Sequence, residues 1–150
     1  MAETEGIPGD LSDPRDKLVL IVDDDVSILD LLEHVVRKEG FRVEQAADGQ
    51  EAVNKARELK PHLLLLDFML PGMGGYEVVK ELQVGETSGI PIVVFTGRHL
   101  DRTSIDLIRQ ERNVRDFMEK PIKPAFLTSL IHRLLKTRPP EITRASDRKW

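Results

Sequence analysis

The sequence predicts an α/β fold of three layers, in which a five-stranded parallel sheet is flanked by five helices. Strand-like and helix-like segments alternate five times between residues 17 and 137, and such alternation is typical of a parallel sheet with helices on both faces. The first strand-like segment, KLVLIV, is apolar without interruption, as expected for a strand that is covered on both sides. Because crossovers between parallel strands are right-handed, only a few topologies remain.

The first two strand and helix units extend to about residue 60. The strand of residues 17–22 precedes a helix whose apolar residues recur at spacings of three and four. These residues are Ile28, Leu31, Leu32, Val35 and Val36. We expect Gly40 to end this helix, and the mixed pattern of residues 41–45 predicts a strand nearer an edge of the sheet. Asp48 is expected to cap the next helix. The inward-facing residues of that helix are predicted to be Ala52, Ala56 and Leu59.

The other three units follow a helix break at Pro61. Four consecutive leucines, residues 63–66, form the most apolar strand of the chain, and this strand ends at Asp67. After it we predict a short helix with Val78, Val79 and Leu82 and a strand over residues 90–95. A helix over about residues 101–111, which has a weak apolar stripe, comes next. A strand over residues 116–119 and a final helix complete the domain. In that last helix the apolar stripe is regular, and Pro124 suits its first turn.

Length and composition favour one soluble domain with two short tails. The chain has 150 residues and a formal net charge of -4, which disfavours direct binding to nucleic acid because such binders carry basic patches. It has no cysteine, so thiolate chemistry is excluded, and no apolar run approaches the roughly 18 residues that span a bilayer. We therefore expect a cytoplasmic protein without membrane contact. Residues 1–16 and 138–150 are expected to be disordered tails around a domain of residues 17–137.

Polar residues stand directly after four of the five predicted strands. The first strand is followed by Asp23, Asp24 and Asp25, and the others end at Asp67, Thr96 and Lys120. Each residue taken alone has an ordinary structural explanation, and Asp25 is expected to cap the following helix. Taken together they meet at one edge of the sheet, where ligands bind in open parallel sheets. The joint pattern favours a functional site over a set of unrelated turn residues.

Several carboxylates at one edge repel one another, and each of them resists ionisation. A hard cation relieves this repulsion, and Mg²⁺ prefers a few carboxylates together with water and phosphate oxygens. A carboxylate can also attack phosphorus and form an aspartyl phosphate. Lys120 and the hydroxyl of Thr96 are suited to stabilise the charge of a phosphoryl group on Asp67.

Four segments carry a resemblance to a known family. VLIVDDD, LLLLDFMLPGMGG, VVFTGR and DFMEKP resemble the response-regulator receiver family, whose best-known member is the chemotaxis regulator. The resemblance covers about residues 17 to 137, with the segments in the order of the family and at about its spacing. It implies the CheY-like (flavodoxin-like) strand order 2-1-3-4-5, and it makes the domain of residues 17–137 a receiver domain.

The resemblance also implies a role for individual residues. Asp67 corresponds to the phosphoacceptor, and Lys120, whose bond to Pro121 is expected to be cis, corresponds to the lysine that contacts the phosphoryl group. Thr96 and Phe117 correspond to the two switch residues. Metal ligands are expected from Asp23, Asp24, Asp67 and the backbone carbonyl of Met69, with Mg²⁺ or Mn²⁺ as the ion. The sequence departs from the family at Gly97, where alanine is usual, and at Phe117, where tyrosine is commoner.

The resemblance predicts a two-component response regulator that is phosphorylated by a sensor histidine kinase or a phosphotransfer protein and controls an unknown output protein. We expect a monomer or weak dimer that catalyses only its own phosphorylation and dephosphorylation. One alternative is a phosphatase-type enzyme with an aspartyl-phosphate intermediate, which needs a general acid and usually a cap domain. A nucleotide- or flavin-binding domain is a second, although three aspartates replace the expected glycine-rich turn. A third is a receiver that acts only as a scaffold.

Overall fold

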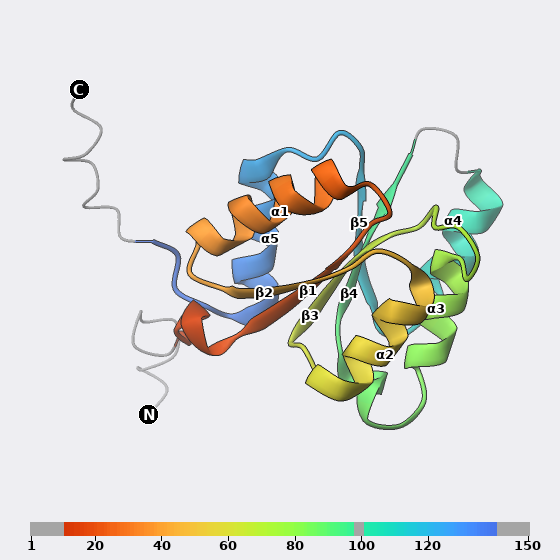
Figure 1. Ribbon diagram of the computed structural model, residues 1–150, viewed down its shortest axis with the longest axis horizontal. Coiled ribbons are helices and arrows are strands. Elements are labelled where there is room, and N and C mark those ends of the chain that lie inside the picture. The colour runs from red at the N-terminus through yellow and green to blue at the C-terminus, as the bar shows by residue number, and fades with distance from the viewer. Residues whose placement is uncertain (1–10, 98–100, 141–150) are drawn as a thin grey trace.

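The computed structural model describes residues 11–97 and 101–140. Its five strands form one parallel sheet in the order β2-β1-β3-β4-β5, which confirms the predicted topology (Figure 1). The strands are β1 (Leu18–Val22), β2 (Arg42–Ala46), β3 (Leu63–Asp67), β4 (Ile92–Thr96) and β5 (Val114–Glu119). The fifth strand therefore begins two residues earlier than predicted.

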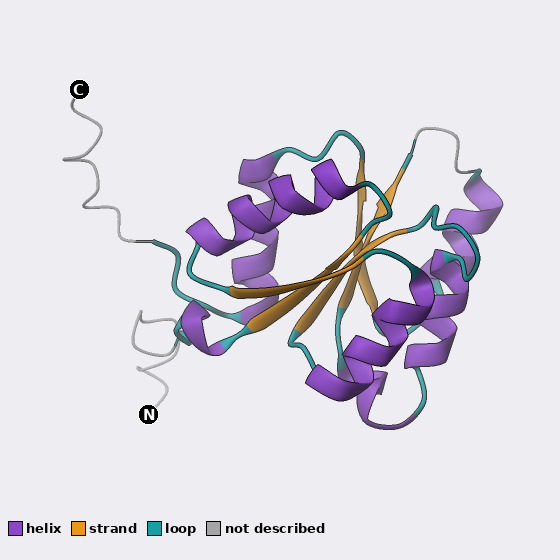
Figure 2. Cartoon of the chain, in the orientation of Figure 1, coloured by secondary structure: helices purple, strands orange, loops and turns teal. Residues whose placement is uncertain are grey.

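Five α-helices and two short 3-10 helices accompany the strands in the described ranges. The α-helices are α1 (Val26–Lys38), α2 (Gly49–Leu59), α3 (Gly75–Leu82), α4 (Arg102–Arg109) and α5 (Pro124–Leu135), and the 3-10 helices are η3 (Pro14–Asp16) and η4 (Gly85–Gly89). The 3-10 helix η3 precedes β1, and α5 follows β5. Helices α1 and α5 cover one face of the sheet, and α2, α3 and α4 cover the other (Figure 2). Within the described ranges, no helix is long and apolar enough to cross a membrane.

The three central strands carry the core. Every residue of β1, β3 and β4 is buried, and burying one leucine side chain contributes roughly 1.5 to 3 kcal/mol relative to leaving it exposed. The register pairs Val22 with Leu66 and Asp67 with Phe95. As a result, the polar residues that follow these strands emerge from one edge of the sheet, next to each other.

The predicted helix ends are confirmed. The Asp25 carboxylate accepts a hydrogen bond from the Ser27 N–H at 2.9 Å and caps α1, and Asp48 caps α2 in the same way. Gly40 follows α1 with a φ of 104°, a conformation that disfavours a side chain. Pro124 occupies the first turn of α5. Local sequence signals therefore place these helix ends correctly.

The predicted buried faces of α1 and α2 need correction. Leu31 is 57% exposed, whereas Leu29, which the predicted stripe left out, is buried. In α2, Leu59 is 37% exposed and Val53 is buried instead. Spacing alone allows two overlapping stripes on α1, and contact with the sheet and α5 selects the one that contains Leu29. Leu59 is the last residue of α2, directly before the left-handed Lys60.

The predicted tails also need correction at their inner ends. Asp13 caps the 3-10 helix η3, and Ser12 forms a parallel bridge with Thr137. The Arg138 N–H donates to the Ser12 carbonyl at 2.9 Å. Residues 11–16 and 136–138 therefore form a paired segment, the terminal clasp, and the folded unit extends beyond the predicted 17–137. The outer parts of both predicted tails, residues 1–10 and 141–150, lie outside the described residues.

Candidate functional site

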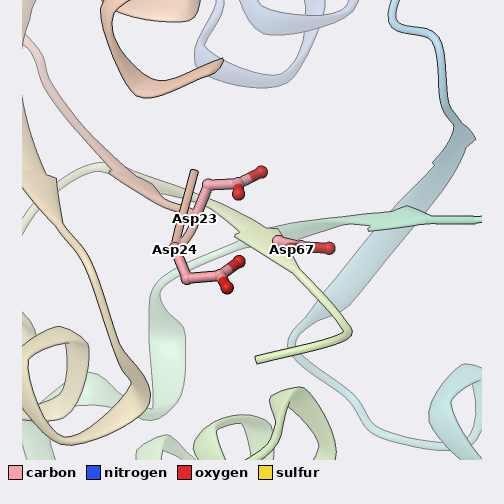
Figure 3. Close-up of side chains that lie close together, drawn as sticks. All are labelled: Asp23, Asp24 and Asp67. Atoms are coloured by element: carbon pink, nitrogen blue, oxygen red, sulfur yellow. The ribbon is translucent and has the colours of Figure 1, made fainter. Parts of the chain in front are cut away.

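Three aspartates meet at the carboxyl ends of β1 and β3 (Figure 3). Asp23 and Asp24 follow β1, and Asp67 is the last residue of β3. One carboxylate oxygen from each residue lies within 4.8 Å of the other two. Asp23 and Asp67 are buried, at 1% and 4% exposure, whereas Asp24 is exposed. The predicted acidic group is thus assembled, with one member open to solvent.

Lys120 reaches this group from the end of β5. Its Nζ lies 3.1 Å from Asp23 Oδ2 and 3.3 Å from Asp67 Oδ1. The Lys120 N–H donates to the Thr96 carbonyl at 2.8 Å, and the Lys120–Pro121 bond is cis, as predicted. The hydrogen bond to Thr96 fixes the backbone of Lys120 at the end of β4, from which its side chain reaches the acids. The sheet therefore brings together residues 97 positions apart in the sequence.

The electrostatics of the site follow from burial and crowding. Burial raises the pKa of Asp67, and the negative charge of Asp23 adds to this effect, while Lys120 and the N–H of Met69 oppose it. Burial disfavours the charge of Lys120, but its hydrogen bond to Asp23 and the charges of both acids outweigh this and raise the lysine's pKa. Burial thus dominates the raised pKa of Asp67, whereas the neighbouring acids dominate the raised pKa of Lys120.

The donor set fits a hard divalent cation. Three carboxylates face one ammonium group, so the cluster carries more negative than positive charge. Oxygen ligands of this kind are those that Mg²⁺ prefers. Met69 has its backbone beside the acids, since its N–H donates to Asp67 Oδ1 at 3.3 Å. Within the described ranges, this is the one cluster of potential metal-binding side chains found.

The two predicted switch residues lie on the neighbouring strands β4 and β5. Thr96 is buried at the end of β4, one position beyond Phe95, the partner of Asp67. Phe117 is half-buried in β5 and packs against the core under α2, α3 and α4. The guanidinium group of Arg109 lies 4.7 Å from the centroid of its ring. The Arg109 contact was not predicted, because no sequence signal links a residue of α4 to one of β5.

Within the described part of the chain, no histidine belongs to a cluster of potential metal-binding side chains. His62 Nδ1 accepts a hydrogen bond from the Leu18 N–H at 3.0 Å. His132 is buried and hydrogen-bonded at both ring nitrogens, and His34 is exposed. Arg98 and His99 follow Thr96 by two and three positions in the sequence, and both lie outside the described residues.

Comparison with known proteins gives consistent matches. Residues 19–132 match the family described as the response regulator receiver domain. The DNA-binding response regulator MtrA of Mycobacterium tuberculosis is 39% identical over 119 residues, which cover 79% of this chain and 50% of that protein. A putative response regulator of Chloroflexus aurantiacus has a similar structure, with a TM-score of 0.72, 31% identity and coverage of 79% and 97% of the two chains.

A further solved structure bears on the metal. The receiver domain of the sensor histidine kinase PA1611 of Pseudomonas aeruginosa, described with a magnesium ion coordinated in its active-site cleft, aligns with a TM-score of 0.71 and 28% identity over 79% of this chain and 97% of that one.

The chain spans about half the length of the curated relatives that it matches. MtrA is named as a DNA-binding protein, so the comparisons do not support the predicted absence of nucleic-acid contact. The matched residues, the strand order and the acidic cluster agree with one another, and this chain belongs to the response regulator receiver domain family of two-component systems.

Proposed function

We propose that Asp67 accepts a phosphoryl group from a phosphohistidine of a sensor histidine kinase or phosphotransfer protein. The observation that carries this proposal is the position of Asp67, which is buried beside two other acids and lies 3.3 Å from the ammonium group of Lys120. A buried carboxylate at the edge of a parallel sheet can attack phosphorus only if neighbouring positive charge offsets the incoming negative charge. Lys120 supplies such a charge from within the chain.

The proposed transfer conserves atoms and charge. A carboxylate oxygen of Asp67 forms a bond to phosphorus while the bond between phosphorus and the imidazole nitrogen of the donor breaks. The electron pair of that bond returns to the imidazole nitrogen. One proton taken up by the imidazole ring from solvent makes the leaving group neutral imidazole. Lys120 holds one Asp67 oxygen and leaves the other available. The positive charge of Lys120 also stabilises the oxygens of the phosphoryl group in transit.

The residues that would hold Mg²⁺, or Mn²⁺, are Asp23, Asp24, Asp67 and the backbone carbonyl of Met69. When bound, such an ion neutralises charge on the transferring phosphoryl group. Asp23 is kept in place by the N–H of Asp25, which donates to its Oδ1 at 2.9 Å. The exposed position of Asp24 leaves this side of the cluster open to an ion and to water.

The proposed consequence of phosphorylation is a change of shape. A phosphoryl group adds roughly -1.5 to -2 charges and several strong acceptor oxygens. The Thr96 hydroxyl is drawn toward these oxygens, and Phe117 rotates into the space that Thr96 leaves. This repositions α4 and β5, which then control an output partner. We propose that the chain acts in the cytoplasm as a monomer or weak dimer and through contacts with other proteins. Its net charge of -4 favours protein contacts over direct contact with nucleic acid.

A phosphatase-type enzyme is the less favoured alternative. It needs a second acid free to donate a proton to a leaving group. Of the two neighbouring acids, Asp23 is already bonded to Lys120 and to the N–H of Asp25, and Asp24 lies on the solvent side of the cluster. We therefore propose a phosphoacceptor whose own Asp67 side chain is modified and restored, rather than an enzyme that turns over an external substrate.

The decisive experiment is intact mass spectrometry after incubation with a small acyl phosphate. The native chain is expected to gain the mass of one phosphoryl group when Mg²⁺ is present and to gain little when a chelator removes it. Asp67→Asn is the matched control, because it keeps the size of the side chain and removes the nucleophile. Equal labelling of both proteins would exclude Asp67 as the acceptor.

A further inference from the structure

Helix α4 is held to the domain almost entirely at its C-terminal end. Of the residues in its first six positions, 102–107, none is buried, and Ile108 is the one fully buried side chain of the helix. Its N-terminal end has a local cap, in which the Asp101 carboxylate accepts from the Ser104 N–H at 2.8 Å. A cap of this kind moves with the helix. The first half of α4 is therefore weakly packed against the rest of the protein.

Glu111 fastens the other end of the helix to α3. Its side chain is only 12% exposed and accepts a hydrogen bond from the amide group of Gln83, the C-terminal cap of α3. The Lys80 Nζ lies 3.6 Å from its second carboxylate oxygen. A largely enclosed carboxylate with two partners is costly to separate from them, since each partner loses a charge-assisted contact.

The backbone around Glu111 is fixed as well. The Glu111 N–H donates to the Ile108 carbonyl at 3.0 Å, and the Val114 N–H donates to the Glu111 carbonyl at 3.1 Å. The next contact ties this connection to the sheet, because the Ile92 N–H donates to the Asn113 carbonyl at 2.8 Å. Glu111 thus lies in a short segment that joins α4, α3 and the start of β4.

Arg109 lies between this fixed end and the proposed switch residue. Its guanidinium group stacks on the Phe117 ring at 4.7 Å, an attractive arrangement for a cation and an aromatic face. Rotation of Phe117 would break or displace this contact. The contact therefore couples the position of the Phe117 ring to the C-terminal end of α4, next to Glu111.

We propose that Glu111 is a positioning residue that serves as the pivot of α4, so that activation swings the first half of the helix while residues 108–111 stay in place. The proposal rests on the proposed function, since it specifies how the same site moves its output helix. Displacing residues 102–107 exposes no buried side chain, whereas displacing the other end would expose Ile108 and separate Glu111 from both of its partners. The N-terminal half of α4 is therefore expected to move, because it is the more weakly attached end of the helix.

The test is amide hydrogen exchange, read residue by residue by NMR, on the whole chain with Mg²⁺ and with or without beryllofluoride as a phosphoryl mimic. In the native protein, the mimic is expected to change exchange at residues 101–107 and near Thr96 and Phe117, and to leave residues 108–111 unchanged. Glu111→Ala is expected to accelerate exchange of residues 108–111 by about tenfold and to extend the effect of the mimic through them.

Two further variants keep the test decisive. Gln83→Ala removes one partner of Glu111 from the α3 side and should reproduce part of the effect even if Glu111→Ala does not fold. Glu81→Ala is the matched control, because Glu81 is an exposed glutamate of α3 that pairs with Arg57 at 3.0 Å; it should leave the exchange of α4 unchanged.

The outcomes separate this inference from the proposed function. If beryllofluoride altered no amide of residues 96–120, the proposed switch itself would be wrong. A uniform response across residues 101–111 of the native protein, with Glu111→Ala indistinguishable from Glu81→Ala, would overturn the pivot and leave the switch standing.

Discussion

At the carboxyl ends of the strands three aspartates lie together and one lysine pairs with two of them, whereas at the amino ends a buried histidine has a partner at each ring nitrogen. His132 Nδ1 lies 2.8 Å from the Thr137 hydroxyl, and its Nε2 lies 2.9 Å from a carboxylate oxygen of Glu39. Its ring also lies 5.0 Å from that of Phe41. This set joins the C-terminal cap of α1 through His132 of α5 to Thr137 of the terminal clasp.

The two edges of the sheet therefore serve different properties: the carboxyl ends of the strands carry the functional site, and the amino ends contribute to stability. The His132 ring at the amino ends has a partner at each nitrogen within the chain, so its contribution is structural and needs no ligand. The acids at the carboxyl ends are crowded, and burial and Asp23 both raise the pKa of Asp67. The ionised form of Asp67 is therefore disfavoured in the folded chain, and a bound cation or phosphoryl group can stabilise this site. Substitutions at the two ends should therefore affect different properties.

The largest expected effect is on the rate of phosphorylation. Lys120→Ala removes the ammonium group 3.3 Å from Asp67, and loss of one such electrostatic contact slows a reaction by about 100-fold or more. The rate of labelling by a small acyl phosphate, followed by mass spectrometry, measures this. Lys123→Ala, which changes an exposed lysine three residues away, serves as the control. A rate within about twofold of the native value would mean that Lys120 does not act on the phosphoryl group.

The next effect is on stability at the opposite end. His132→Ala removes both hydrogen bonds of the ring and leaves Glu39 without this partner, so the free energy of unfolding should fall by about 2 kcal/mol. Urea denaturation measures it, with the exposed His34→Ala as control, for which a change within about 0.5 kcal/mol is expected. Labelling of Asp67 should remain at the native rate. Equal stability of the two variants would show that the histidine set does not hold the amino ends together.

The smallest effect is on how stability depends on pH. Because the pKa of Asp67 is raised in the folded state, the folded chain binds its proton more tightly, and stability is lost as the pH rises from the usual carboxyl pKa through the raised one. The Asp67→Asn variant does not lose stability in this way, because its amide side chain does not ionise. In the presence of a chelator it should therefore be more stable than the native chain at neutral pH, and the difference should shrink on acidification. Denaturation at a series of pH values tests this; a variant less stable than the native chain at neutral pH would contradict it.

The sequence alone is informative wherever the signal is local. Strand order along the chain, the caps at Asp25 and Asp48, and the polar residues at the strand ends all follow from neighbouring residues. The acidic cluster could be anticipated for a further reason: in a parallel sheet every strand ends at the same edge, so residues after separate strands must converge. Thus Asp23, Asp67 and Lys120 could be grouped before any coordinates were known.

Tertiary structure alone decided which face of a helix is buried and which distant polar groups pair. A periodic stripe on α1 does not specify its partner, and packing against the sheet and α5 selected Leu29 in place of Leu31. His132 and Glu39 are 93 positions apart, and the Glu111 contact with Gln83 spans 28. Such pairs leave no pattern in the sequence, because the physical cause of each is proximity that exists only after the chain has folded.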